Sequence, residues 1–257
     1  MAWENYRMTF DLHTHTTYSH GWPRPHGKGT VEENVRAAIA KGLQGIAISD
    51  HGPGHVFYGL RPEKIMAQRQ DIRSAQSAHP EIRVYMSVEA NLTWGKKNRL
   101  DVDAETAKKF DFLIAGYHYG VPLCGSVPNW IGSHLHLGEK LMRTKNTDLY
   151  VSALYENKIK VLTHPGDKGL VDIEEVAKAC AANHTLMEIN NSHTHLTVRE
   201  IRAAMKEDVY FIISSDAHTP ERVGTFEKAL ERAQKAGLDF SRIVNIRKIK
   251  GDDDDRE

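Results

Sequence analysis

The segment FDLHTHTTYSHG (residues 10–21) joins an apolar, strand-like run to three closely spaced histidines, His13, His15 and His20. Side chains on a β-strand repeat on one face every second residue, so His13 and His15 are expected to project the same way. The same arrangement, an apolar run with a titratable residue at its carboxyl end, recurs along the chain. The recurrence indicates the fold.

Short apolar runs alternate with helix-like segments from one end of the sequence to the other. The runs cover residues 6–12, 43–49, 82–88, 110–116, 158–163, 185–190 and 209–214. Most are rich in β-branched or aromatic residues, as strands are. Strand–helix units in series predict parallel strands covered by helices, an α/β fold.

The segments between these runs carry the residues that begin and end helices. Capping-box spacings are Thr30 with Glu33, Asp172 with Glu175 and Thr197 with Glu200; Pro62 and Pro220 stand at expected helix starts, and Gly42 and Gly237 at expected ends. Nothing else divides the chain, so we expect one domain over residues 1–257. The long connection 120–148 predicts a lid, a binding loop or a further helix. The acidic tail 251–257 is expected to be solvated and frayed.

Polar residues stand at the carboxyl end of every apolar run. In chain order they are His13, His15 and His20; Asp50 and His51; Glu89; His118; His164; Glu188 and Asn190; Asp216 and His218. In parallel α/β folds the active site lies at these strand ends. An open sheet would spread them along an edge, whereas a closed barrel makes them converge. The distribution favours a TIM-like barrel of seven strands.

The residue types at this rim predict a metal site with more than one ion. Seven histidines, one glutamate and one aspartate are candidate ligands: His13, His15, His20, His51, Glu89, His118, His164, Asp216 and His218. One ion takes about four to six ligands, so two or three clustered ions are expected. Imidazole and carboxylate without thiolate suit zinc, manganese or iron. Glu188 ends a strand at the same rim but could equally be a hydrogen-bonding group that orients a ligand, so it is left out of the ligand set.

The remaining histidines are weaker candidates. We expect His26, His55, His79 and His184 to be ordinary hydrogen-bonded loop residues. The group His134, His136, His193 and His195 is open between lining the mouth and being solvated, and solvation is favoured.

Composition limits the partners and the compartment. Lys plus Arg and Asp plus Glu both number 34 in 257 residues, so charge gives no reason to expect nucleic acid or an anionic membrane as partner. No apolar run reaches the ~20 residues that span a bilayer, and the first ten residues do not resemble a signal peptide. Two isolated cysteines, Cys124 and Cys180, favour a reducing, cytoplasmic location. Composition leaves the oligomeric state open.

Seven motifs taken in order resemble one known family. They are DLHTHTTYSHG, GIAISDHG, EAN, AGYHYG, THPG, EINNS and SSDAH. Together they resemble the PHP (polymerase and histidinol phosphatase) domain family over nearly the whole chain, and its stand-alone bacterial phosphatase branch in particular. The connection 120–148 and the HTH triplet 193–195 depart from the pattern and bear on substrate choice.

The resemblance implies a distorted (β/α)7 barrel with three divalent metal ions. It implies that the first ion is held by His13, His15, Glu89 and Asp216, and that Glu89 bridges to a second ion held by His118 and His164. The third ion would take His20, His51 and His218. All nine positions of the family pattern are filled in this sequence.

The expected activity is hydrolysis of a small-molecule phosphate monoester. Two close metals lower the pKa of a shared water, and the resulting metal-bridging hydroxide would attack phosphorus. No serine or cysteine stands in a recognisable nucleophile motif. His195 is a candidate proton donor to the leaving group, and Asp50 is a candidate for orienting His51. Arg61, Lys168 and Arg222 are candidate phosphate-binding cations.

Three alternative functions stay open. A metal-dependent amidohydrolase also uses a His-x-His barrel site, but it needs neither a bridging Glu89 nor the extra set His20, His51 and His218. Phosphodiester cleavage, including exonuclease activity, occurs in the family, but neutral charge and the lack of a basic–aromatic stripe count against it. A non-catalytic metal-binding module is disfavoured by the complete ligand set. Fold-level likeness does not choose the substrate.

Overall fold

The central element is a sheet of seven parallel strands in chain order. The computed structural model describes residues 2–19, 21 and 25–249. The strands are β2 (Phe10–Thr14), β3 (Gly45–Ile48), β4 (Arg83–Asn91), β5 (Phe112–Gly116), β6 (Ile159–Leu162), β7 (Leu186–Asn190) and β8 (Phe211–Ser214). The prediction of seven parallel strands is confirmed.

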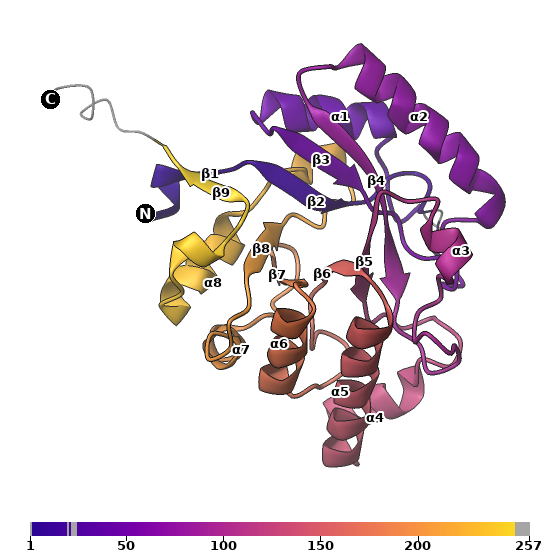
Figure 1. Ribbon diagram of the computed structural model, residues 1–257, viewed down its shortest axis with the longest axis vertical. Helices are drawn as coiled ribbons and strands as arrows, with labels where there is room; N and C mark the ends of the chain where they lie inside the picture. Colours follow the sequence, from indigo (N-terminus) through magenta and orange to yellow (C-terminus); the bar gives the residue numbers. More distant parts are fainter. Residues whose placement is uncertain (1, 20, 22–24, 250–257) are drawn as a thin grey trace, which may run out of the picture.

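The first and last of these strands meet and close the sheet into a nearly complete barrel. Thr14 and Ala217 form a parallel bridge, and the backbone N–H of His15 donates to the carbonyl of Ala217 at 2.8 Å. Figure 1 shows the helices arranged around the outside of the strands. Closure brings the carboxyl ends of the strands to one mouth, as the TIM-like expectation requires.

The helices follow the strands around the barrel. They are α1 (Val31–Ala40), α2 (Ile65–Ala78), α3 (Ala104–Ala107), α4 (Ser126–Leu135), α5 (Glu139–Glu156), α6 (Ile173–Ala182), α7 (Val198–Ala204) and α8 (Glu227–Ala236). Thr30 and Thr197 form complete capping boxes, as predicted. Asp172 caps α6 by accepting from the backbone of Glu174 and Glu175.

Pro62 and Pro220 each begin a helical turn, as predicted, and in both cases the turn is 3₁₀: Pro62–Lys64 and Pro220–Arg222. The turn at Pro62 runs directly into α2, which begins at Ile65. At the other ends, Gly237 has a φ of 78° and is the residue that terminates α8. Only glycine adopts this conformation without a steric cost, so this predicted helix end is confirmed.

Apolar packing forms two separate cores. The inner one lies inside the barrel and is made only of strand residues: Leu12, Ala47, Ile114, Val161 and Ile212. The larger one fills the space between strands and helices and includes α-helical residues such as Val35 and Leu154. Since the inner core occupies the barrel interior, the polar strand-end residues are left at the mouth.

A bulge in β2 lets apolar and polar residues of one strand both face the barrel interior. The pairing of β2 with β3 slips between Asp11, opposite Ile46, and Thr14, opposite Ile48, so that β2 has one extra residue. An extra residue reverses the side-chain alternation beyond it. Leu12 therefore packs in the inner core, while His13 faces the cluster at the mouth.

Two parts of the chain were predicted incompletely. The first apolar run, 6–12, is divided into β1 (Tyr6–Met8) and β2. Between them, the backbone N–H and the hydroxyl of Thr9 both donate to the carbonyl of Asn245. The strand β9 (Ile246–Lys248), not predicted, pairs antiparallel with β1 beside the barrel.

The connection 120–148 forms α4 and the first half of α5, so the expectation of a hidden helix is confirmed. The acidic tail 251–257 lies outside the described residues. Among the helices that the structure describes, none is both long and apolar enough to cross a membrane.

Candidate metal centre

The Glu89 carboxylate occupies the middle of a cluster of imidazoles. It is fully buried at the carboxyl end of β4. Its Oε1 lies 3.0 Å from His164 Nε2 and 3.4 Å from His118 Nε2. Its Oε2 lies 3.0 Å from His51 Nδ1 and 3.3 Å from His13 Nε2. One carboxylate therefore presents each oxygen to a different set of histidines, as a group that bridges two ions would.

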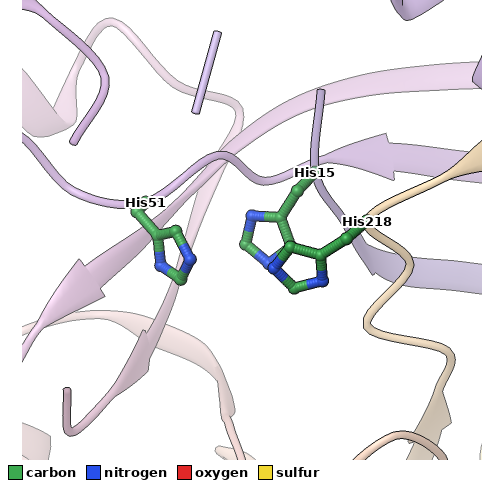
Figure 2. A group of neighbouring side chains, drawn as sticks. All are labelled: His15, His51 and His218. Carbon is green, nitrogen blue, oxygen red and sulfur yellow. The ribbon is translucent and has the colours of Figure 1, made fainter. Parts of the chain in front are cut away.

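Four overlapping sets of side chains have donor atoms within 4.8 Å of one another. They are His15, His51 and His218; His13, His164 and Asp216; His13, His15 and Glu89; and His51, Glu89 and His118. Figure 2 shows the first set, whose three side chains come from different segments of the chain: His15 lies beyond β2, His51 beyond β3 and His218 beyond β8. The sets share members, so they form one cluster.

Eight of the nine predicted ligands are thus brought together, and they come from the ends of every barrel strand except β7. The ninth, His20, lies outside the described residues. Glu89 lies between His13 and His15 on one side and His118 and His164 on the other. The assignment of residues to separate ions stays a prediction, because the sets also place His51 with Glu89 and His118, and His164 with His13 and Asp216. Of the third set, His51 and His218 have donor atoms within 4.8 Å of each other and of a donor atom of His15.

Unpartnered buried atoms show that the cluster fits a divalent ion. Within the described part of the chain, His15 Nδ1, both ring nitrogens of His51 and Glu89 Oε2 are buried without a hydrogen bond. His51 Nδ1 and Glu89 Oε2 lie 3.0 Å apart but in a geometry that makes no hydrogen bond. Burying such atoms unpaired is costly, whereas a nitrogen- and oxygen-binding cation would satisfy the Glu89 oxygen and one ring nitrogen of each histidine.

Unusual backbone conformations occur at two of the strand-end ligands. His164 has a φ of 27° and Asp216 a φ of 51°, both outside the range that side-chain-bearing residues prefer. The backbone N–H of His164 is held by Glu188 Oε2 at 2.7 Å, and the carbonyl of Asp216 accepts from His218 Nδ1 at 3.0 Å. Strain of this kind is typical of functional sites.

Polar side chains behind the ligands fix their orientation. His13 Nδ1 lies 2.7 Å from Glu188 Oε1, and His118 Nδ1 lies 2.9 Å from Asn91 Oδ1. A neutral ligand histidine that donates its Nδ1–H to such a group has a fixed tautomer, and its Nε2 keeps a lone pair for a metal. The alternative in which Glu188 orients a ligand agrees with this contact.

Charges within the cluster shift the pKa values of its members in opposite directions. Burial opposes the charge on His13, but Glu89, Asp216 and Glu188 outweigh it and raise the pKa of His13 well above its ordinary value. Burial also opposes the charge on Glu89, but the surrounding histidines, His118 and His13 foremost, lower its pKa well below the usual range. The pKa of Asp216 is lowered likewise.

Three other imidazoles of the cluster have lowered pKa values. Burial lowers the pKa of His15 and of His51 well below the ordinary value. It lowers the pKa of His118 to about 3. A neutral imidazole has the lone pair that a metal needs, so these rings are ready to bind an ion.

A cavity of about 280 Å³ opens beside the cluster. Its lining residues are His26, His51, His55, Tyr58, Glu89, His118, Tyr119, His164, Lys168, His193, Asp216 and His218. Of the three candidate phosphate-binding cations, only Lys168 is in this lining. Arg61 is exposed, and Arg222 is exposed and donates to Ser192 Oγ at 2.9 Å. The structure therefore favours Lys168.

His193 lies on the cavity wall between two carboxylates. Its Nδ1 lies 3.1 Å from Asp167 Oδ2 and its Nε2 lies 3.2 Å from Asp216 Oδ2. Burial opposes its charge, but these two partners raise the pKa of His193 to about 9. Of the two alternatives left open for His193, solvation was favoured, but the half-buried Asp167 and the buried Asp216 hold it at the cavity.

His195, the candidate proton donor, is not part of the cavity lining. Its Nδ1 lies 3.2 and 3.1 Å from the two oxygens of Glu200, the residue that completes the capping box of α7. The side chain is thus held against a helix start. His134 and His136 are exposed, as expected.

Asp50 does not contact the ring of His51. It accepts from the backbone of Thr16 and Ser19 at 2.8 and 3.0 Å and from Gln68 Nε2 at 2.6 Å. Burial raises its pKa to about 6. Asp50 therefore fixes the loop after β2, and Ser19 of that loop accepts from the backbone N–H of His51 at 3.2 Å, so the role of Asp50 in orienting His51 stays a prediction.

Two histidines assigned to ordinary loops belong to the cavity. His26 stacks on Tyr58, with ring centroids 4.0 Å apart, and His55 packs on the other side of Tyr58 at 4.7 Å. No strand-end pattern marks these three residues, so sequence reasoning missed them. Asp167 was also missed, although it lies three residues beyond His164 in the THPGD motif. His79, by contrast, pairs with Glu32 at 2.9 Å near the surface, and His184 is exposed, as expected.

A nearly closed barrel whose mouth holds buried histidines and acids is the architecture of a metal-dependent barrel hydrolase. A model of the PHP domain matches residues 11–212. The chain belongs to the PHP domain family.

Full-length relatives agree with this assignment. A probable phosphatase of Thermoanaerobacter sp. (strain X514) is 28% identical over 265 residues, covering 95% of this chain and 94% of the relative. A probable phosphatase of Caldanaerobacter subterraneus subsp. tengcongensis is 29% identical over 258 residues, covering 93% and 87%. The prediction of a phosphatase is confirmed at the level of this class.

A solved structure shares the fold. Histidinol phosphate phosphatase from Lactococcus lactis subsp. lactis Il1403, in complex with zinc, L-histidinol and phosphate, superposes with a TM-score of 0.57 at 15% identity. The match covers 90% of this chain and 95% of that one. The expectation of a distorted TIM-like barrel is confirmed.

Proposed function

We propose that this phosphatase hydrolyses a small-molecule phosphate monoester at the 280 Å³ cavity, using three divalent ions held by the cluster. The observation that carries the proposal is the Glu89 carboxylate, which faces His118 and His164 with one oxygen and His13 and His51 with the other. Ions in such a site supply Lewis acidity and lower the pKa of water.

We assign the first ion to His13, His15, Glu89 and Asp216, and the second to Glu89, His118 and His164. The third would be held by His51 and His218, with His20. Zinc, manganese and iron all suit these donors. Outside the cluster, Glu188 and Asn91 hold the rings of His13 and His118, so that the cluster keeps its geometry through the reaction.

The cavity wall provides positive charge for an anionic substrate. Lys168 and His193 both line the cavity and share Asp167, at 3.5 Å and 3.1 Å respectively. They would bind phosphate oxygens and stabilise the charge that develops there. Among the described residues lining the cavity there is neither a serine nor a cysteine, so the residue set supports attack by water.

The small cavity supports a small substrate. Ligand pockets for drug-sized molecules occupy about 300–1,000 Å³, and this cavity, at about 280 Å³, lies just below that range. Histidinol phosphate, the substrate named for the Lactococcus lactis structure, is a reasonable first candidate.

The test is a phosphate-release screen on protein purified without chelator, after elemental analysis of its metal content. The panel should contain small monoesters including histidinol phosphate, a chromogenic phosphodiester, a cyclic amide and single-stranded DNA. Release of phosphate from monoesters, lost in Glu89→Gln, supports the proposal. Turnover of only the diester, the DNA or the amide would overturn it, as would protein that binds no metal.

A further inference from the structure

His26 places a ring nitrogen next to a candidate ligand. The Nε2 atom of His26 lies 2.7 Å from the Nε2 atom of His218. The ring of His26 is stacked on Tyr58 at 4.0 Å with an interplanar angle of 10°, which fixes its plane. His26 also lies beside His51, with ring centroids 5.1 Å apart, and lines the cavity.

The tautomer of His218 determines whether its Nε2 can bind a metal ion. His218 Nδ1 lies 3.0 Å from the carbonyl oxygen of Asp216, which can only accept a hydrogen bond, so Nδ1 carries the proton. His218 Nε2 therefore presents a lone pair, and it points to the same place as His26 Nε2. Both ring nitrogens of the neighbouring His51 lack hydrogen-bond partners among the described residues. Several unshared imidazole nitrogens thus meet at this point.

We propose that His26 is a further ligand of the ion that His51 and His218 hold. The proposal rests on the metal centre of the proposed function. It adds an imidazole to a set that already contains His51 and His218, with His15 close to both. A site richer in nitrogen donors favours zinc or ferrous iron over magnesium or calcium, which prefer oxygen. The third ion is therefore a transition metal.

The competing explanation is a structural hydrogen bond between two neutral rings. In that case His26 Nε2 carries a proton and donates it to His218 Nε2. His26→Gln separates the two explanations, because the glutamine amide donates a hydrogen bond but is a poor ligand for these ions. His26→Ala removes both functions. His134→Gln is the matched control, since His134 is exposed on α4, contacts Trp130 of its own helix and does not line the cavity.

The experiment measures metal binding directly. Full-length wild type and the three variants are stripped, reloaded with Co²⁺ or Zn²⁺, and dialysed against graded chelator before metal analysis. Co²⁺ absorption reports the ligands, and thermal unfolding of the stripped forms reports folding. We expect His26→Gln and His26→Ala to lose affinity for one ion by at least about tenfold, with an altered Co²⁺ spectrum, while His134→Gln matches wild type.

Two results would overturn the inference. One is an unchanged ion count, affinity and Co²⁺ spectrum in His26→Gln and His26→Ala. The other is a loss in His26→Ala that His26→Gln restores, which would show a hydrogen bond in place of a ligand. Failure of wild type itself to bind ions is a separate result, because it would reject the proposed function and not only the role of His26.

Discussion

The Nδ1 atom of His13 lies 2.7 Å from Glu188 Oε1, although the two residues are 175 positions apart in the chain. The other oxygen of Glu188 accepts from the backbone of His164 at 2.7 Å and from Asn190 Nδ2 at 2.9 Å. One buried carboxylate therefore holds the ring of one ligand and the backbone of another. Glu188 needs acceptor atoms on both sides, which only a carboxylate provides.

Glu188→Gln should weaken metal binding without abolishing folding. The amide NH₂ of glutamine would face either His13 or the two donors at His164 and Asn190, leaving a buried contact unmade. We expect a 10- to 100-fold loss of metal affinity, in the range typical of groups that orient ligands. Chelator competition measures it, with the exposed Glu174→Gln as control. An affinity equal to that of wild type would show that Glu188 does not orient the site.

Glu89→Gln should abolish turnover and reduce the number of bound ions. Glu89 faces histidines of two sets, and an amide cannot supply a negative oxygen to both. Far-ultraviolet circular dichroism should stay unchanged, because the barrel core does not depend on this side chain. Elemental analysis and phosphate release are measured on the same preparation. A variant that kept near wild-type rates would disprove the assignment of Glu89.

Removal of metal should destabilise the folded protein. The cluster buries unpartnered atoms of His15, His51 and Glu89, which a bound ion would satisfy. A ligand present at 100 times its Kd stabilises the native state by about 2.7 kcal/mol. For a chain of this size that corresponds to a fall in Tm of roughly 5–10 °C on chelation. Differential scanning calorimetry measures the shift, and addition of Zn²⁺ or Mn²⁺ should reverse it. An unchanged Tm in protein shown to lose its metal would contradict this prediction.

The sequence predicted the barrel because local pattern carries the necessary information. Apolar runs and capping residues such as Thr30 and Thr197 mark the elements, and parallel strands must end at a common rim. The same rule predicted the candidate ligands, since Glu89 lies near the carboxyl end of β4 and Asp216 lies just beyond β8. In this part of the fold, order along the chain determines position in space.

The rest of the site depends on loops that return to the mouth, and no local pattern specifies their path. His26 and Tyr58 lie in different loops and meet only because both fold over the same cavity. The local sequence around His193 does not distinguish it from a solvated histidine, because its contact with Asp167 arises only in the folded chain. The short pair β1–β9 was missed for the same reason, because its two strands come from opposite ends of the chain.

Lys168→Met should raise the KM for a phosphate monoester more than it lowers kcat. Lys168 lines the cavity, whereas the exposed Arg61 does not, so Arg61→Met is the matched control. Loss of one charge-assisted hydrogen bond to an anion costs about 1.5–3 kcal/mol, or roughly 10- to 100-fold in kcat/KM. Steady-state kinetics and competition by inorganic phosphate should both show the loss. Equal effects in the two variants would remove Lys168 from the binding site.

Histidines 193 and 195 should differ sharply in their effect on catalysis. His193 is held over the cavity by Asp167 and Asp216, and we expect His193→Gln to lower kcat/KM by about 10- to 100-fold through loss of positive charge near the phosphate. His195 contacts Glu200 at the start of α7, so His195→Gln should leave kcat/KM nearly unchanged and lower Tm slightly. Parallel kinetics and thermal unfolding of the two variants make the comparison. A large catalytic loss in His195→Gln with little in His193→Gln would reverse the assignment, because the side chain on the cavity wall would then not be the one that acts on the substrate.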